Sequence, residues 1–221
     1  MEHSKLIETT INFVKEKLRN AEGGHDWFHI ERVYKNTLLI AKEESCNLLV
    51  CELGALLHDI ADSKFHPDAS GGDEKIGPQT ARDFLEKQNV SEEIIDHVIA
   101  IIENISFKGG NFEKKFSSIE LDIVQDADRL DAIGAIGIAR CFNYGGFKNR
   151  TLYNPEILPN LNMTKEEYKK SEAPTINHFY EKLLLLKDKM NTTTGKKIAT
   201  QRHLYMEGFL EQFYSEWEGL C

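Results

Sequence analysis

Residues 53–62 read LGALLHDIAD, an apolar run that carries one histidine and two aspartates. Its leucines, alanines and isoleucine are typical of a buried helix, and we expect this helix to continue through His58 and Asp59 toward Asp62. A buried carboxylate loses its hydration, which is costly unless the group is paired, protonated or bound to a metal. The stretch therefore predicts a buried helix whose polar side chains have a specific partner.

Helical periodicity extends over almost the whole chain of 221 residues. Strand-like alternation between turn dipeptides is scarce, so the sequence predicts an all-α protein. A chain of this length can build one well-formed core or two small ones. We expect a single domain over residues 1–221, with a core at about 20–145 and a C-terminal helical appendage at about 163–221. The predicted helices cover residues 1–18, 29–45, 46–62, 76–89, 91–105, 117–142, 164–190 and 195–220.

Charge and cysteine content argue against several classes of protein. The formal net charge of −9 offers no electrostatic footprint for duplex nucleic acid. No apolar run approaches the roughly 18–20 residues that a membrane-spanning helix needs, and the N-terminus has no secretory apolar region. The four cysteines fall in no CxxC or zinc-ribbon spacing, so we expect free thiols and a cytoplasmic location.

Histidines and aspartates recur on the apolar faces of three predicted helices. The alanines and glycines beside the last group leave room between helices for something other than a side chain. Neutral imidazoles together with carboxylates form a nitrogen–oxygen site that suits Mn²⁺, Fe²⁺, Co²⁺, Ni²⁺ or Mg²⁺ better than structural zinc. The groups are His25 with His29, His58 with Asp59, and Asp126 with Asp128 and Asp131.

Three blocks in order, HDWFHIERV, LLHDIAD and QDADRLDAIGAIGIAR, resemble the H…HD…D signature of the HD-domain metal-dependent phosphohydrolases. With their flanks they are similar to the small bacterial subgroup labelled YpgQ/YedJ-like, from about residue 20 to the C-terminal HFYEKLLLLKDKM block and beyond. The resemblance implies an all-α HD-domain helical bundle. It also implies a divalent metal held by four side chains, namely His29, His58, Asp59 and Asp128.

The resemblance further implies hydrolysis of phosphate esters or anhydrides by a metal-activated water. Some members of the subgroup are nucleoside triphosphate pyrophosphohydrolases, so we expect a small phosphorylated substrate, favour a nucleotide, and favour manganese as the metal. Dinuclear HD enzymes carry further histidines between the HD pair and the last aspartate. Here that interval holds only His66 and His97, which favours one metal ion over two.

Other residues near these motifs are candidates for catalysis and substrate binding. Asp62 is placed to deprotonate or orient the water, or alternatively to hold a metal-binding imidazole in one tautomer. Glu103 is a second candidate base, although its position also suits a solvated helix face. An anionic substrate in an acidic protein needs local cations and donors, and the candidates are His25, Arg32, Lys64, Lys108 and Arg129.

Alternative functions stay open at this point. The same fold would serve a 5′-nucleotidase or other phosphomonoesterase, which removes a terminal phosphate instead of pyrophosphate. A non-catalytic module would bind metal and nucleotide as a sensor. A di-iron oxygenase is disfavoured by the shortage of histidines. The sequence also leaves the exact substrate and homo-oligomerisation open.

Overall fold

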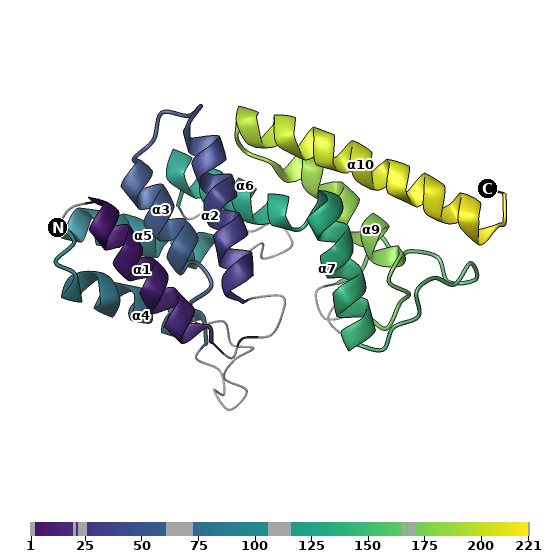
Figure 1. The fold of residues 1–221 in the computed structure, drawn as a ribbon, viewed down its shortest axis with the longest axis horizontal. Coiled ribbons are helices and arrows are strands. Elements are labelled where there is room, and N and C mark those ends of the chain that lie inside the picture. Colours follow the sequence, from purple (N-terminus) through teal and green to yellow (C-terminus); the bar gives the residue numbers. More distant parts are fainter. Residues whose placement is uncertain are drawn as a thin grey trace. The chain divides into compact units, whose positions relative to one another are not determined.

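The computed structural model describes residues 3–19, 21, 26–60, 73–105, 116–164, 167 and 171–220 (Figure 1). Over these residues the chain forms helices and no strand, which confirms the all-α prediction. None of the described helices is both long and apolar enough to cross a membrane. The helices are α1 (His3–Lys17), α2 (Trp27–Ala41), α3 (Leu48–Leu57), α4 (Asp73–Lys87), α5 (Glu92–Asn104), α6 (Ile119–Asp131), α7 (Gly134–Phe147), α9 (Asn177–Glu181), the 3₁₀ helix η2 (Leu183–Lys189) and α10 (Thr193–Trp217).

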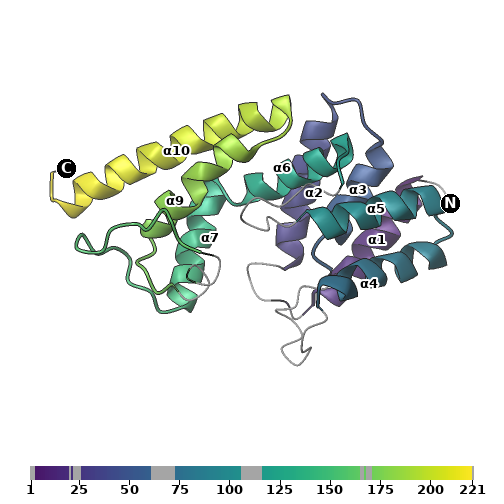
Figure 2. The ribbon, with the colours of Figure 1, turned by 180° about the vertical axis from the view of Figure 1, so that it is seen from behind.

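The chain divides into two compact units, Met1–Asp128 and Arg129–Cys221. The first unit contains α1 to α5 and most of α6, coloured purple to teal in Figures 1 and 2. The second contains the end of α6 and then α7, α9, η2 and α10, coloured green to yellow. The single domain over residues 1–221 stays a prediction.

Helix α3 forms the centre of the first unit. Every residue from Val50 to Leu57 is buried, and the helix packs against α1, α2 and α5. Gly54 allows this close packing, because a Cβ atom there would lie 3.3 Å from Ile101 of α5 and 3.6 Å from Val124 of α6. A helix that is apolar and buried all round is held by its neighbours on every side, so it fixes the position of the residues that follow it.

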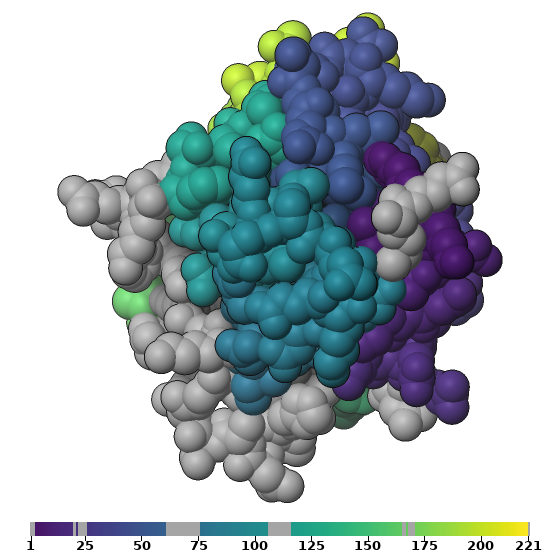
Figure 3. Space-filling view, turned by 90° about the vertical axis from the view of Figure 1, so that its left-hand side faces the viewer, coloured from purple at the N-terminus to yellow at the C-terminus, as the bar shows by residue number. Residues whose placement is uncertain are grey.

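Helices α1 and α4 cover this core from the outside, where α1 lies beside α4 and α5 on the surface shown in Figure 3. The amphipathic α1 confirms the helix predicted at the N-terminus. Phe13 of α1 stacks on Phe84 of α4 with ring centroids 4.1 Å apart. Lys15 of α1 places its ammonium 4.7 Å from the centre of the Trp27 ring, which is a cation–π contact to the start of α2.

The helix predicted over residues 117–142 is interrupted. Helix α6 ends at Asp131, and α7 begins at Gly134, whose φ of 74° lies in the left-handed region that favours glycine. A Cβ atom at Gly134 would also lie 3.0 Å from the side chain of Arg202 in α10. The prediction of one continuous helix is wrong, because the left-handed backbone of Gly134 breaks the helix. The apolar period of the sequence continues across this break and therefore does not reveal it.

The prediction of one helix over residues 164–190 is also wrong, because the described part of this segment is helical over shorter stretches. Residues 171–176 form no helix, and after them the described chain is helical at α9 and then tightens into the 3₁₀ helix η2. The backbone N–H groups of Thr175 and Ile176 donate to the carbonyls of Thr151 and Leu152, at 2.9 and 3.1 Å. Pro174 has no N–H to give to a helix, so this segment pairs with another stretch of backbone instead.

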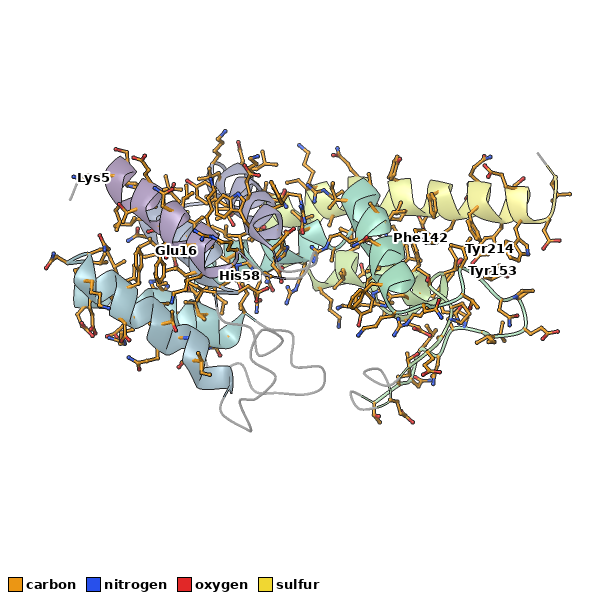
Figure 4. The ribbon with its side chains drawn as sticks, turned by 60° about the horizontal axis from the view of Figure 1, so that its bottom comes forward. Lys5, Glu16, His58, Phe142, Tyr153 and Tyr214 are labelled. Carbon is orange, nitrogen blue, oxygen red and sulfur yellow. The ribbon has the colours of Figure 1, made fainter. Side chains whose placement is uncertain are left out.

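The second unit is built around the end of α6 and an aromatic core. The Asp131 side chain forms an ion pair with Arg140 of α7, and Arg202 of α10 donates to the carbonyl of Leu130. Aromatic side chains fill the space between α7, α9 and α10, and Figure 4 labels three of them. The ring contacts include Phe142 with Phe179 at 5.9 Å, Tyr153 with Tyr214 at 5.4 Å and Tyr153 with Trp217 at 5.0 Å.

His178 of α9 should make the protein less stable in mild acid. Its burial, together with the charges of Lys182 and Arg150, lowers its pKa to about 4. An unfolded histidine titrates near pH 6.5, so between these values the unfolded chain binds a proton that the folded chain does not. The free energy of unfolding should therefore fall as the pH drops from about 6.5 to about 4, by on the order of 3 kcal/mol.

Urea unfolding at several pH values across this window checks the effect. His178→Gln should remove the contribution of one proton to the slope of unfolding free energy against pH. If the variant and the wild type lose stability in parallel over the window, other groups cause the acid sensitivity.

Candidate metal centre

The residues of the H…HD…D pattern all belong to the first unit and lie at or near the ends of three helices. Helix α2 begins at Trp27 because the Asp26 side chain accepts a hydrogen bond from the backbone N–H of His29, at 3.0 Å. This cap fixes His29 in the first turn of α2. His58 and Asp59 follow directly after α3, and Asp128 lies in the last turn of α6.

The prediction that a helix continues through His58 and Asp59 is wrong. Helix α3 ends at Leu57, and the two residues lie in the turn that follows. The last carbonyls of a helix have no backbone partner within it. His58 supplies one, because its Nδ1 lies 2.8 Å from the carbonyl oxygen of Ala55. The histidine therefore caps the helix with one ring nitrogen and presents the other to the site.

The Nε2 atoms of both imidazoles lie close to the two carboxylates. His29 Nε2 lies 3.5 Å from an oxygen of Asp128 and 3.8 Å from an oxygen of Asp59. His58 Nε2 lies 3.9 Å from each of the same two oxygens. Ligand atoms of His29, His58 and Asp59 all lie within 4.8 Å of one another. Figure 4 shows His58 among the helices of the first unit.

The protonation of His58 follows from its hydrogen bond to Ala55. A carbonyl oxygen only accepts, so Nδ1 carries the proton and Nε2 of the neutral ring keeps a lone pair. This Nε2 atom is buried and has no hydrogen-bond partner among the residues that the structure describes. A buried polar atom without a partner is costly in a folded protein. A cation bound at Nε2 removes that cost, so the site fits a metal ion.

Exposure differs between the two kinds of donor. The imidazole side chains of His29 and His58 are each 3% exposed, whereas the carboxylates of Asp59 and Asp128 are 24% and 39% exposed. The histidines thus form the floor of the site and the aspartates its rim. A mixed nitrogen–oxygen donor set without thiolate suits a divalent cation of the Mn²⁺ or Fe²⁺ type. An anionic ligand would approach such a cation from the side of the aspartates.

Of the other predicted site residues, four cannot be placed in the structure and three can. His25, Asp62, Lys64 and Lys108 lie outside the described residues.

Three more can be placed. Glu103 is exposed on α5, and Arg32 is half-buried on α2, one turn after His29. Arg129, in the second unit, donates to the carbonyl of Lys189 at 2.5 Å. Their roles in catalysis and substrate binding stay predictions.

The structure adds one residue that the sequence reasoning missed. Asn36 of α2 is buried, and its side-chain amide donates to the carbonyl of Ala127, at 3.3 Å. Ala127 directly precedes Asp128. The only signal in the sequence is that an asparagine interrupts the apolar stripe of this helix seven residues after His29.

Comparison with known proteins defines the class. Residues 27–133 match the HD domain family. The chain belongs to this family, whose fold and donor set are those of metal-dependent phosphohydrolases.

Relatives match the chain over its whole length. YpgQ of Bacillus subtilis is 37% identical, in an alignment that covers 100% of this chain and 98% of that protein. A crystal structure of an HD-superfamily hydrolase from Bacillus thuringiensis superimposes with a TM-score of 0.78 at 44% identity, covering 98% of both chains. The crystal structure of B. subtilis YpgQ in complex with ADP superimposes with a TM-score of 0.75 at 31% identity, covering 98% of this chain and 97% of that one.

Proposed function

We propose that the protein is a nucleoside triphosphate pyrophosphohydrolase that uses one divalent metal ion, with manganese favoured. The observation that carries the proposal is that the Nε2 atoms of His29 and His58 lie 3.5–3.9 Å from carboxylate oxygens of Asp59 and Asp128. Nε2 of His58 is also buried, with no hydrogen-bond partner among the described residues. The complex of YpgQ with ADP supports a nucleotide as the substrate, because that relative matches nearly all of this chain. The cysteine pattern keeps a cytoplasmic location as part of the proposal.

The chain's own residues explain why the reaction should require a cation. Two carboxylates, Asp59 and Asp128, form the rim of the site, and they repel a triphosphate at close range. A bound divalent ion would neutralise them, polarise a water molecule and stabilise charge on the phosphoryl oxygens. The Ala55 carbonyl meanwhile holds His58 in the tautomer that leaves Nε2 available.

The remaining predicted residues complete the proposal. Asp62 and Glu103 are the candidate bases that would accept the proton of the attacking water. The candidates for binding the phosphates are His25, Arg32, Lys64, Lys108 and Arg129.

Product analysis by phosphorus NMR tests the proposal. The purified protein is incubated with nucleoside triphosphates and monophosphates in the presence of Mn²⁺, and Asp59→Ala serves as the control. We expect pyrophosphate and a nucleoside monophosphate from the triphosphates, strictly dependent on the cation and absent with the variant.

Two other results would change the assignment. Orthophosphate released only from monophosphates would make the protein a nucleotidase. Metal binding without turnover of any nucleotide would remove support for an enzyme acting on this panel and favour a binding module.

A further inference from the structure

We infer that Asn36 is a positioning residue that holds Asp128 in register with the two histidines of the metal centre. The inference rests on the metal site of the proposed function and adds to it a residue outside the four predicted metal ligands. It concerns only α2, α3 and the part of α6 that lies in the first unit.

Asn36 and His29 contact α6 at adjacent residues. They are seven residues apart on α2, which is two helical turns, so both lie on the same face of the helix. His29 Nε2 lies 3.5 Å from an oxygen of Asp128, while the Asn36 amide donates to the carbonyl of Ala127 at 3.3 Å. The two contacts start two turns apart on α2 and end at adjacent residues of α6. Together they fix the rotation and the axial position of α6 relative to α2.

Asn36 is a costly residue for a buried helix face. Asparagine is a weaker helix former than leucine, and its amide loses hydration when it is buried. An apolar side chain would pack at this position at a lower cost. What the amide adds is a directional bond to a specific carbonyl, and buried polar groups can set register in this way.

The neighbouring residue provides a matched control. Thr37 is fully buried on the same helix, and its hydroxyl has no hydrogen-bond partner among the described residues. Thr37→Val therefore changes a buried polar side chain one position away without removing a bond. Its effect on the metal site should be negligible.

The metal affinity of the folded protein shows whether Asn36 orients a metal ligand or only stabilises the fold. Binding of Mn²⁺ is titrated for the wild type, Asn36→Leu and Thr37→Val, and urea unfolding is measured for each protein without metal. We expect the dissociation constant to rise about 10-fold for Asn36→Leu and to stay within about 2-fold for Thr37→Val, as for other residues that orient metal ligands. A purely structural residue would lower the stability of the metal-free protein and leave the affinity of the folded fraction unchanged.

A double-mutant cycle tests whether Asn36 acts through Asp128. In an Asp128→Ala background, Asn36→Leu should cause no further loss of affinity, because the ligand that it positions is gone. The absorption spectrum of the Co²⁺ form should change with Asn36→Leu in the wild-type background and remain unchanged with Thr37→Val. If Asn36→Leu does not fold, Asn36→Ser takes its place, since the shorter side chain falls short of the Ala127 carbonyl; we expect the same direction of change.

The possible failures are distinguishable. Equal affinity of Asn36→Leu and the wild type, with both proteins folded, would overturn the inference alone. An equal further loss in the Asp128→Ala background would also overturn it. A wild type that binds Mn²⁺ but hydrolyses no nucleotide would overturn the proposed function and leave the Asn36 result standing. A wild type that binds no divalent cation would overturn both.

Discussion

Asp59→Ala should lower the rate of cation-dependent nucleotide hydrolysis by at least about 100-fold, because it removes a charged donor from the candidate metal centre. The oxygen of Asp59 lies 3.8 and 3.9 Å from the Nε2 atoms of His29 and His58, which places this carboxylate beside both imidazoles. The measurement is the initial rate with saturating Mn²⁺, together with the melting temperature with and without the metal.

The melting temperature separates loss of the site from loss of the fold. Mn²⁺ at 100 times its dissociation constant should stabilise the wild type by about 2.7 kcal/mol and should stabilise Asp59→Ala far less. Asp83→Ala, which removes an exposed carboxylate from α4, is the control and should retain wild-type rate and metal response. Turnover of Asp59→Ala within a few-fold of the wild type would show that this residue is not a metal ligand.

Arg140→Met should destabilise the protein by about 2–4 kcal/mol, because it removes a charged hydrogen-bond donor from a buried carboxylate. The Asp131 side chain is only 2% exposed, so its carboxylate is largely shielded from water. The free energy of unfolding in urea is the quantity to measure. A destabilisation below about 1 kcal/mol would mean that Asp131 finds another partner or takes up a proton.

Two further variants separate the buried pair from an exposed one. Arg82→Met removes an arginine whose acidic partners, Glu92 and Asp96, are mostly exposed, and it should cost no more than about 1 kcal/mol. The double variant Asp131→Leu with Arg140→Met should recover part of the stability lost by Arg140→Met, because the buried carboxylate is removed together with its arginine.

The residues of the candidate site could be recognised in the sequence because each lies in a short motif on an apolar background. His58 and Asp59 stand out within LGALLHDIAD, and Asp128 stands out among small apolar residues. The all-α fold was equally accessible, since apolar periodicity is repeated along most of the chain. These features depend on residues close together in sequence.

The features that the sequence did not reveal depend on partners far apart or on a backbone carbonyl. At the end of α3, His58 bonds to the backbone carbonyl of Ala55. Every residue has a backbone carbonyl, so no sequence pattern marks this one as a partner. Asn36 meets Ala127 across 91 positions of the chain. The break between α6 and α7 depends on the φ angle of Gly134, while the composition around it continues to favour a helix.

The division into two compact units has a spectroscopic consequence. The chain has two tryptophans, and each unit contains one of them: Trp27 at the start of α2 and Trp217 at the end of α10. Trp217→Phe leaves a single emitter in the first unit, beneath the ammonium of Lys15, and Trp27→Phe leaves one beside Tyr153 in the second. Fluorescence of the two variants thus follows the melting of each unit separately. Coincident curves would mean that both halves unfold together, and separate midpoints would give each half its own stability.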